Sequence, residues 1–220
     1  DLLAYTENQA PTAVDPGLSV TDVDSTTLSS ATVNLSSGFA SGQDVLAFVN
    51  QNGITGSYNP STGVLTLSGL ATVADYENAL SSVGYANTSD QPSTSPRTIT
   101  FAVNDGSGSN ATASASRNVA ITAINDAPVL TLSAGTVAYT EQQGSVLVDP
   151  ALTLSDVDSS TFVGATVQLS DNYIPGQGLL GFATQGGITG SFDSSTGTLT
   201  LSGNATAAQR SEEHTSELQS

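Results

Sequence analysis

The stretch GITGSYNPSTGVLTLSG, residues 53–69, contains two alternating runs on either side of a turn. Residues 54–58 and 64–68 alternate with a period of two, which is the pattern of a half-buried strand. Between them, residues 59–63 supply the Asn, Pro, Ser and Gly that favour a turn. The stretch therefore predicts a β-hairpin in which Leu65 and Leu67 face the core.

The same hairpin sequence occurs a second time, as GITGSFDSSTGTLTLSG at residues 187–203, which is 134 positions later. Tyr-Thr-Glu at 5–7 and Asp-Val-Asp-Ser at 22–25 return with the same offset, at 139–141 and 156–159. A repeat of this length is a whole domain rather than one turn of a solenoid. The chain is therefore predicted to contain two copies of one domain.

Most of the first repeat consists of short alternating runs between turn residues, which is typical of an all-β sandwich. One segment differs, because Val73, Tyr76, Leu80 and Val83 have helical spacing and follow Thr72, a good N-cap residue. We therefore expect tandem Greek-key β-sandwiches with one short helix in each repeat.

The offset also sets the expected domain boundaries. The first repeat is expected over residues 1–126, with its start clipped inside a first strand, and the second, truncated repeat over 127–209. Residues 125–128, Asn-Asp-Ala-Pro, form a short linker that Pro128 stiffens. Residues 210–220 break the repeat abruptly and can be read as a translated sequencing-library adapter, so we expect this tail to be an artefact.

The charge of the chain argues against several functions. It has 20 acidic residues, 3 basic ones and a formal net charge of −17, and lysine is absent. Binding nucleic acid needs clustered Lys and Arg, so no nucleic-acid partner is expected. No apolar run is long enough for a membrane span. The only histidine, His214, lies in the expected artefact, which leaves no ordinary base for a Ser or Thr nucleophile, and we expect no enzymatic activity.

Acidic residues recur in predicted loops, in the motifs Glu-Asn at 7–8, Asp-Val-Asp at 22–24, Asn-Asp-Gly at 104–106 and Asn-Asp at 125–126. Carboxylate and amide oxygens are the ligands that Ca²⁺ takes in proteins. Carboxylates that cluster without a cation repel one another. Asp and Asn are also ordinary turn formers, so a calcium site and metal-free acidic turns both remain open.

In this order, the motifs resemble those of cadherin repeats, and most of all the bacterial cadherin-like repeats of large secreted or cell-surface adhesins. In that family, a strand glutamate, a D-x-D loop, a D-x-G turn and an N-D-x-P linker hold calcium at repeat junctions. The resemblance covers both repeats without the tail and implies a cadherin/Ig-like sandwich. The sequence departs from the pattern of animal cadherins in its longer repeat and its additional helix.

Carried over to this sequence, the resemblance implies two calcium sites. The junction between the repeats would use the ligands Glu7, Asn125, Asp126, Asp156 and Asp158. The opposite end of the first repeat would use Asp22, Asp24 and Asp105 at a junction with a preceding repeat. Asp75 and Glu77 have the spacing of a further ligand pair, although acids on a helix more often form a solvated face.

The function that the resemblance implies is a calcium-binding extracellular module that stiffens the stalk of an adhesin. Its partners would be neighbouring repeats of the same chain, with a cell-surface or matrix ligand bound through other domains. The alternative is a metal-free spacer repeat in a secreted enzyme or matrix protein.

Overall fold

The computed structural model describes residues 2–109, 111–212 and 217–219, with side chains described as far as residue 209. His214 and the rest of the tail expected to be an artefact, residues 210–220, therefore lie outside the residues whose side chains are described. The chain divides into two compact units, Asp1–Ile124 and Asn125–Ser220.

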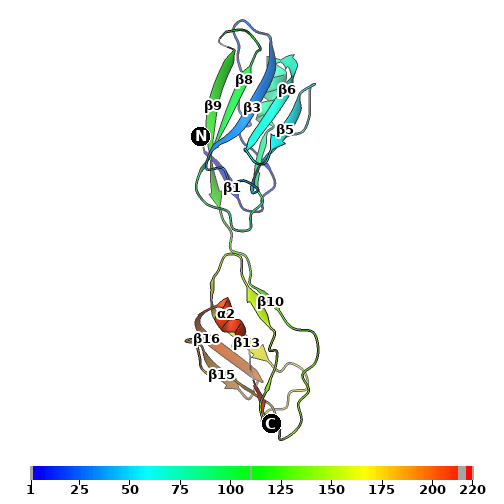
Figure 1. Ribbon diagram of the computed structural model, residues 1–220, viewed down its shortest axis with the longest axis vertical. Coiled ribbons are helices and arrows are strands. Elements are labelled where there is room, and N and C mark those ends of the chain that lie inside the picture. The colour runs from blue at the N-terminus through cyan, green and yellow to red at the C-terminus, as the bar shows by residue number, and fades with distance from the viewer. Residues whose placement is uncertain (1, 110, 213–216, 220) are drawn as a thin grey trace. The chain divides into compact units, whose positions relative to one another are not determined.

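The first unit is built on a six-stranded sheet with the order β1-β9-β8-β3-β6-β5 (Figure 1). Strand β1 pairs with β9 in parallel, and the other neighbours are antiparallel. The expected hairpin is confirmed as β5 and β6, in which Tyr58 pairs with Leu65. The strands are β1 (Leu2–Thr6), β3 (Thr27–Ser37), β5 (Thr55–Asn59), β6 (Val64–Thr72), β8 (Arg97–Asn104) and β9 (Thr112–Thr122).

A smaller sheet completes the sandwich, with β7 (Gly84–Asn87) between β2 (Thr12–Ala13) and β4 (Asp44–Ala47). The core between the sheets includes Leu65 and Leu67, as predicted, and both are almost fully buried. The expected helix is α1 (Val73–Ser81), which connects β6 to β7. Its N-cap is Thr72, whose Oγ1 accepts the N–H of Asp75.

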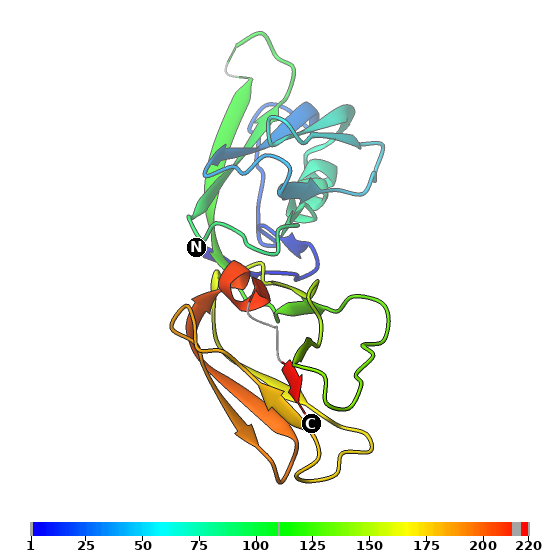
Figure 2. The ribbon, with the colours of Figure 1, turned by 60° about the horizontal axis from the view of Figure 1, so that its bottom comes forward.

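The second unit repeats much of this arrangement. Strand β16 lies between β13 and β15, as β6 lies between β3 and β5 in the first unit, and α2 follows β16 (Figure 2). The all-β sandwich with one short helix per repeat is thus confirmed. The elements are β10 (Val129–Thr131), β11 (Val146–Leu147), β12 (Thr153–Ser155), β13 (Thr161–Gln168), β14 (Leu179–Gly181), β15 (Thr189–Asp193), β16 (Thr198–Thr206), α2 (Ala207–Glu212) and β17 (Glu217–Gln219).

The two backbones also turn in the same places. Left-handed φ angles occur at Asn8 and Gln142, which are counterparts at the offset of 134. Six further left-handed positions of the first unit have left-handed counterparts in the second, and the pairs are 38 and 172, 42 and 176, 52 and 186, 53 and 187, 63 and 197, and 69 and 203. The repeat is therefore structural as well as sequential.

Two differences between the units follow from the second repeat's shorter sequence. The counterparts of β8 and β9 would lie beyond residue 220, and residues 136–140, the counterparts of β1, form no strand. Strand β17 lies between β11 and β14, the place that β7 holds in the first unit. Residues 217–219 thus pair within the sheet, and their origin as an artefact stays a prediction.

Candidate metal sites

Glu7 is a buried carboxylate at the end of β1. Because β1 runs parallel to β9, Glu7 lies beside the residues that follow β9, and its N–H donates to the carbonyl oxygen of Thr122 (2.9 Å). Its Oε2 accepts the N–H of Ile124 (2.8 Å), while Oε1 has no hydrogen-bond partner among the described residues. The residue is only 3% exposed, so a charged oxygen is removed from water without a protein donor.

A second carboxylate, that of Asp90, lies beside Glu7. One oxygen of each residue lies within 4.8 Å of the other. Asp90 is exposed and belongs to the loop between β7 and β8. Sequence reasoning missed it, because the second repeat ends before its counterpart and no repeated motif marks it.

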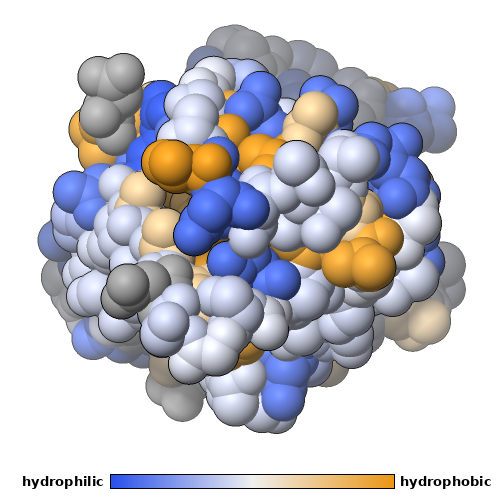
Figure 3. Space-filling view, turned by 90° about the horizontal axis from the view of Figure 1, so that it is seen from above, coloured by the Kyte–Doolittle hydropathy of each residue, from blue (hydrophilic) through white to orange (hydrophobic). Residues whose placement is uncertain are grey.

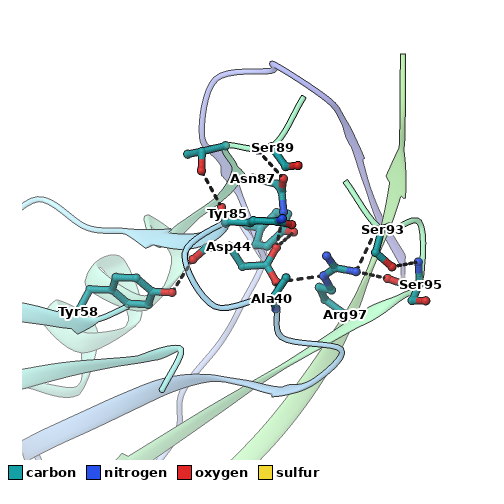
Figure 4. A network of polar contacts seen from close by, with 11 residues as sticks. Ala40, Asp44, Tyr58, Tyr85, Asn87, Ser89, Ser93, Ser95 and Arg97 are labelled. Atoms are coloured by element: carbon teal, nitrogen blue, oxygen red, sulfur yellow. Dashed lines mark hydrogen bonds and ion pairs between the residues drawn. The ribbon is translucent and has the colours of Figure 1, made fainter. Parts of the chain in front are cut away.

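A buried polar network centres on the carboxylate of Asp44, which is fully buried (Figure 4). Its Oδ1 accepts from the hydroxyl of Tyr85 (2.7 Å) and from Nδ2 of Asn87 (2.6 Å). Its Oδ2 accepts from the N–H of Ala40 (2.7 Å) and from Nε of Arg97 (3.1 Å). Four donors thus surround one buried charge, which makes the network well satisfied at its centre.

This network holds both ends of the loop that carries Asp90. At the first end, Oδ1 of Asn87 accepts the N–H of Ser89 (3.0 Å). At the other end, Nη1 of Arg97 donates to the carbonyl oxygens of residues 93 and 95 (Figure 4). The position of Asp90 is therefore fixed by buried groups, although its own side chain is exposed.

Tyr5 connects this loop to the segment of Glu7. Its hydroxyl donates to the carbonyl oxygens of Gln9 (2.7 Å) and Asn87 (3.3 Å), and its ring packs edge-on against that of Tyr85. The first unit thus presents Glu7 and Asp90 on a preorganised surface, which favours ligand binding because little order must be gained on binding.

In the second unit, the predicted ligands of the linker and of the D-x-D loop come together. Oδ1 of Asp156 accepts the N–H groups of Asp158 (2.9 Å) and Ser159 (2.7 Å). Oδ2 of Asp158 accepts the N–H of Asp126 (2.5 Å), and Nδ2 of Asn125 donates to the carbonyl oxygen of Asp126 (2.6 Å). The loop is folded so that acidic oxygens lie against the linker backbone.

At the other end of the first unit, the structure brings Asp22, Asp24 and Asp105 into one group of loops. Oδ1 of Asp22 accepts the N–H groups of Asp24 (3.1 Å) and Ser25 (2.8 Å), as Asp156 does in the second unit. The hydroxyl of Ser25 donates to Oδ2 of Asp105 (3.1 Å).

The face drawn in Figure 3 is mainly hydrophilic or neutral, with apolar residues in separate patches.

Backbone donors tune the acidity of this second group. The N–H of Ser25 and then that of Asp24 lower the pKa of Asp22, partly opposed by desolvation and the charge of Asp105. The N–H of Ser107 is the main cause that lowers the pKa of Asp105. Both groups therefore favour the charged form that a cation binds.

The acidic pair of the helix has structural contacts instead. Asp75 shares the N-cap with Thr72, whose Oγ1 lies 2.6 Å from Oδ2 of Asp75. Oε2 of Glu77 accepts the N–H of Val20 (2.9 Å). One oxygen of each carboxylate therefore has a partner within the first unit.

Comparisons with known proteins give the following similarities. No family model matches the chain. Over 104 residues, or 46% of the chain, it is 36% identical to halomucin from Haloquadratum walsbyi, and this match spans 1% of that protein. Among solved structures, an EC3–6 structure of protocadherin gammaB7 is 12% identical (TM-score 0.24), over 94% of this chain and 38% of that one. The human desmocollin-1 ectodomain is 17% identical (TM-score 0.24), over 92% and 32%.

Within the part of the chain that is described, no helix is both long enough and apolar enough to cross a membrane.

Proposed function

We propose that this chain is a pair of cadherin-like extracellular repeats that bind Ca²⁺ where consecutive repeats join. Calcium bound there stiffens the tandem array, which serves as the stalk of a cell-surface or secreted adhesin. The partners of each repeat are its neighbours in the chain, and the adhesion ligand is bound through other domains. The function is mechanical and needs no catalytic group.

The observation that carries this proposal is the buried carboxylate of Glu7, whose Oε1 lacks a hydrogen-bond partner among the described residues. An unsatisfied charged oxygen is costly to bury, and Asp90 adds a second negative charge nearby. A divalent cation bound by both groups removes this cost. Oxygen ligands of this kind fit Ca²⁺, which takes six to eight of them.

The chain connectivity supports a shared site. Glu7 accepts the N–H of Ile124, and Asp158 accepts that of Asp126, which is only two residues further along. Consecutive Cα atoms are about 3.8 Å apart, so both carboxylates are tied to the same short stretch of backbone. We therefore assign to the junction the ligands Glu7, Asp90, Asn125, Asp126, Asp156 and Asp158.

Asp22, Asp24 and Asp105 are proposed as the corresponding ligands at the other end of the first unit. The Asp22 loop makes the same two backbone bonds as the Asp156 loop, which supports equivalent roles. The similarity to a segment of halomucin supports an extracellular repeat within a much longer protein, since the match spans 1% of that relative.

Thermal unfolding of the chain in calcium and in chelator tests the proposal. A ligand that binds only the folded state at 100 times its Kd stabilises it by about 2.7 kcal/mol, so calcium is expected to raise the melting temperature. Glu7→Gln keeps an acceptor for Ile124 but removes a charge, and it is expected to weaken calcium binding measured by titration calorimetry.

The matched control is Glu141→Gln, since Glu141 is the counterpart of Glu7 and its side chain is exposed. This variant should bind calcium like the unmodified chain. No heat of calcium binding at millimolar concentrations, together with an unchanged melt, would instead favour the metal-free spacer.

A further inference from the structure

The loop between β7 and β8 contains the sequence Pro-Ser-Thr-Ser-Pro at residues 92–96. Pro92 is buried, whereas residues 93–96 are exposed. None of the five belongs to a helix or a strand, and the two prolines disfavour both elements because proline has no N–H to donate. Segments rich in Ser and Thr with Pro are typical of chains that carry O-linked sugars.

Buried groups hold the backbone of this segment against the sandwich. Nη1 of Arg97, a fully buried residue, donates to the carbonyl oxygens of Ser93 (3.0 Å) and Ser95 (2.5 Å) (Figure 4). The loop also packs closely on Gly38, where a Cβ atom would lie 2.4 Å from the carbonyl oxygen of Pro96. The segment therefore has a defined shape in the folded chain, and an enzyme that binds it loses little free energy in ordering it.

Thr94 and Ser95 carry the free hydroxyls of this segment. Neither hydroxyl has a hydrogen-bond partner among the described residues, and the same holds for the N–H and the carbonyl oxygen of Thr94. Ser93 differs, because its Oγ accepts the N–H of Ser95 (3.3 Å). Thr94 thus offers a hydroxyl and two free backbone groups together, and an extended segment of an approaching enzyme can pair with that backbone.

Hydroxyls on the strands of the same unit are less accessible. In β8, Oγ1 of Thr100 lies 2.8 Å from Oγ of Ser36 and 2.9 Å from Oγ of Ser116, which belong to the two neighbouring strands. A strand that is paired on both sides can enter the active site of an enzyme only after local unfolding. The loop at 92–96 needs no such opening.

The loop leads into a part of the sheet that has both neighbours. Strand β8, which follows the loop, lies between β3 and β9 from its first residues, since Arg97 pairs with Val119 and Thr98 with Ser37. The exposure of residues 93–96 is therefore a property of a fully paired end of the sheet.

We propose that this loop is an O-glycosylation site, with the hydroxyls of Thr94 and Ser95 as acceptors and a nucleoside-diphosphate sugar as donor. The hydroxyl oxygen bonds to the anomeric carbon of the sugar, and the bond from that carbon to the diphosphate oxygen breaks. The nucleoside diphosphate leaves with the electron pair, and the hydroxyl proton passes to a base of the transferase. No group is oxidised or reduced, and no calcium ligand takes part.

Transfer of N-acetylgalactosamine to the folded full chain tests this proposal. The chain is incubated with UDP-N-acetylgalactosamine and a polypeptide N-acetylgalactosaminyltransferase, and the modified residues are located by mass spectrometry with electron-transfer fragmentation. Thr94 and Ser95 are expected to be modified about tenfold faster than any strand hydroxyl, since a strand must first open. The chain secreted by cultured animal cells, mapped in the same way, should carry sugar at the same two residues.

Thr94→Val combined with Ser95→Ala should remove this sugar, whereas Thr94→Ser, which keeps a hydroxyl, should retain it. Thr66→Val is the matched control, because it removes an exposed hydroxyl from β6 and should leave the transfer unchanged. Circular dichroism melts show whether the double variant keeps its fold. Transfer that misses Thr94 and Ser95, equal modification of strand hydroxyls, or phosphate in place of sugar on the secreted chain would overturn the proposal.

Discussion

Asp44 and Arg97 form an ion pair that is almost completely removed from solvent. Removal of one partner from a buried pair leaves the other charge uncompensated, at a cost of about 3–5 kcal/mol. Arg97→Met is therefore expected to destabilise the first unit by about this amount in urea unfolding at neutral pH. It also releases the carbonyl oxygens that Arg97 holds in the Asp90 loop.

Arg117→Met is the control for that experiment, because the pair between Arg117 and Asp15 is partly exposed. Exposed pairs contribute about 0–1 kcal/mol, so this variant should unfold close to the unmodified chain. Equal destabilisation by the two variants would contradict a special role for the buried network.

The acidic loops give a pH dependence with a defined sign. The pKa values of Asp22 and Asp105 lie below the ordinary value of 3.8, mainly because of backbone donors. Each charged carboxylate thus favours the folded state above about pH 3.8, and this contribution is lost as the pH falls through the folded pKa. Carbon-detected NMR titration of the side-chain carboxyls in chelator should show both lowered values.

Calcium should lower both values further, since it competes with protons for the same oxygens. Asp193 is the internal control. The hydroxyl of Ser195 is the main cause that lowers the pKa of Asp193. Asp193 is the last residue of β15, where the hairpin turn begins, and lies outside both proposed sites. Its titration should not respond to calcium, and a response as large as that of Asp22 would point to nonspecific binding.

Among single residues, the sequence singled out those that the repeat or the family resemblance marks, and Asp105, Asn125 and Asp126 were selected from the resemblance alone. Glu7, Asp22 and Asp24 could be selected because each returns at an offset of 134. Asp90 and the network of Asp44 could not, because the second copy ends before the counterpart of Asp90 and has Gly178 at that of Asp44. A lone aspartate in a loop and an aspartate at the start of a strand give no signal of burial or of partners.

Among the elements, the hairpins depend on a glycine near the end of each long strand. Gly69 has a φ of +140°, and a Cβ atom there would lie 2.4 Å from the carbonyl oxygen of Gly53. Gly69→Ala is therefore expected to destabilise the first unit by more than about 2 kcal/mol, from strain and from displacement of backbone. The free energy of unfolding in urea measures this effect.

Gly42→Ala separates the two causes. Gly42 also has a positive φ, +80°, but a Cβ atom there would meet nothing within 4 Å. The variant should cost only the strain of a left-handed residue, about 1–2 kcal/mol. A cost for Gly69→Ala no greater than that for Gly42→Ala would show that the close approach to Gly53 is unimportant.

Elements with a local signature were predictable, and their long-range pairing was not. The hairpin followed from alternation around a turn, and α1 from its spacing and the Thr72 cap. The parallel pairing of β1 with β9 joins residues more than a hundred positions apart and has no local pattern. That pairing is what brings Glu7 beside Ile124, so the geometry of the candidate site depended on the least predictable contact.

At the scale of the whole chain, the constant offset predicted two units, and the structure divides the chain at Ile124. The second unit departs from the first where its sequence lacks the strands that would complete the sheet. Its hydrophobic core cluster is correspondingly smaller than that of the first unit. We therefore expect the second unit to unfold first, and differential scanning calorimetry of the chain should resolve two transitions.

Asp156→Asn, which weakens the proposed junction without touching the core of either unit, should move neither transition in chelator. In calcium it should lower the temperature of the calcium-dependent transition, because weaker binding gives less stabilisation at the same calcium concentration. Asp193→Asn removes the same charge elsewhere in the second unit and should leave that transition in place. A calcium response that is equal in both variants would contradict the assigned ligands.

The proposed mechanical role predicts that calcium narrows the distribution of distances between the units. The chain has no cysteine, so Thr66→Cys and Thr200→Cys place one spin label on an exposed strand position of each unit. In chelator, carboxylates at the proposed junction repel one another and the linker is expected to sample many arrangements. In calcium, ligands from both units and the linker should narrow the distance distribution measured by pulsed electron spin resonance. The Asp156→Asn chain should stay broad at calcium concentrations that narrow the unmodified one, whereas equal widths with and without calcium in the unmodified chain would rule out the stiffened stalk.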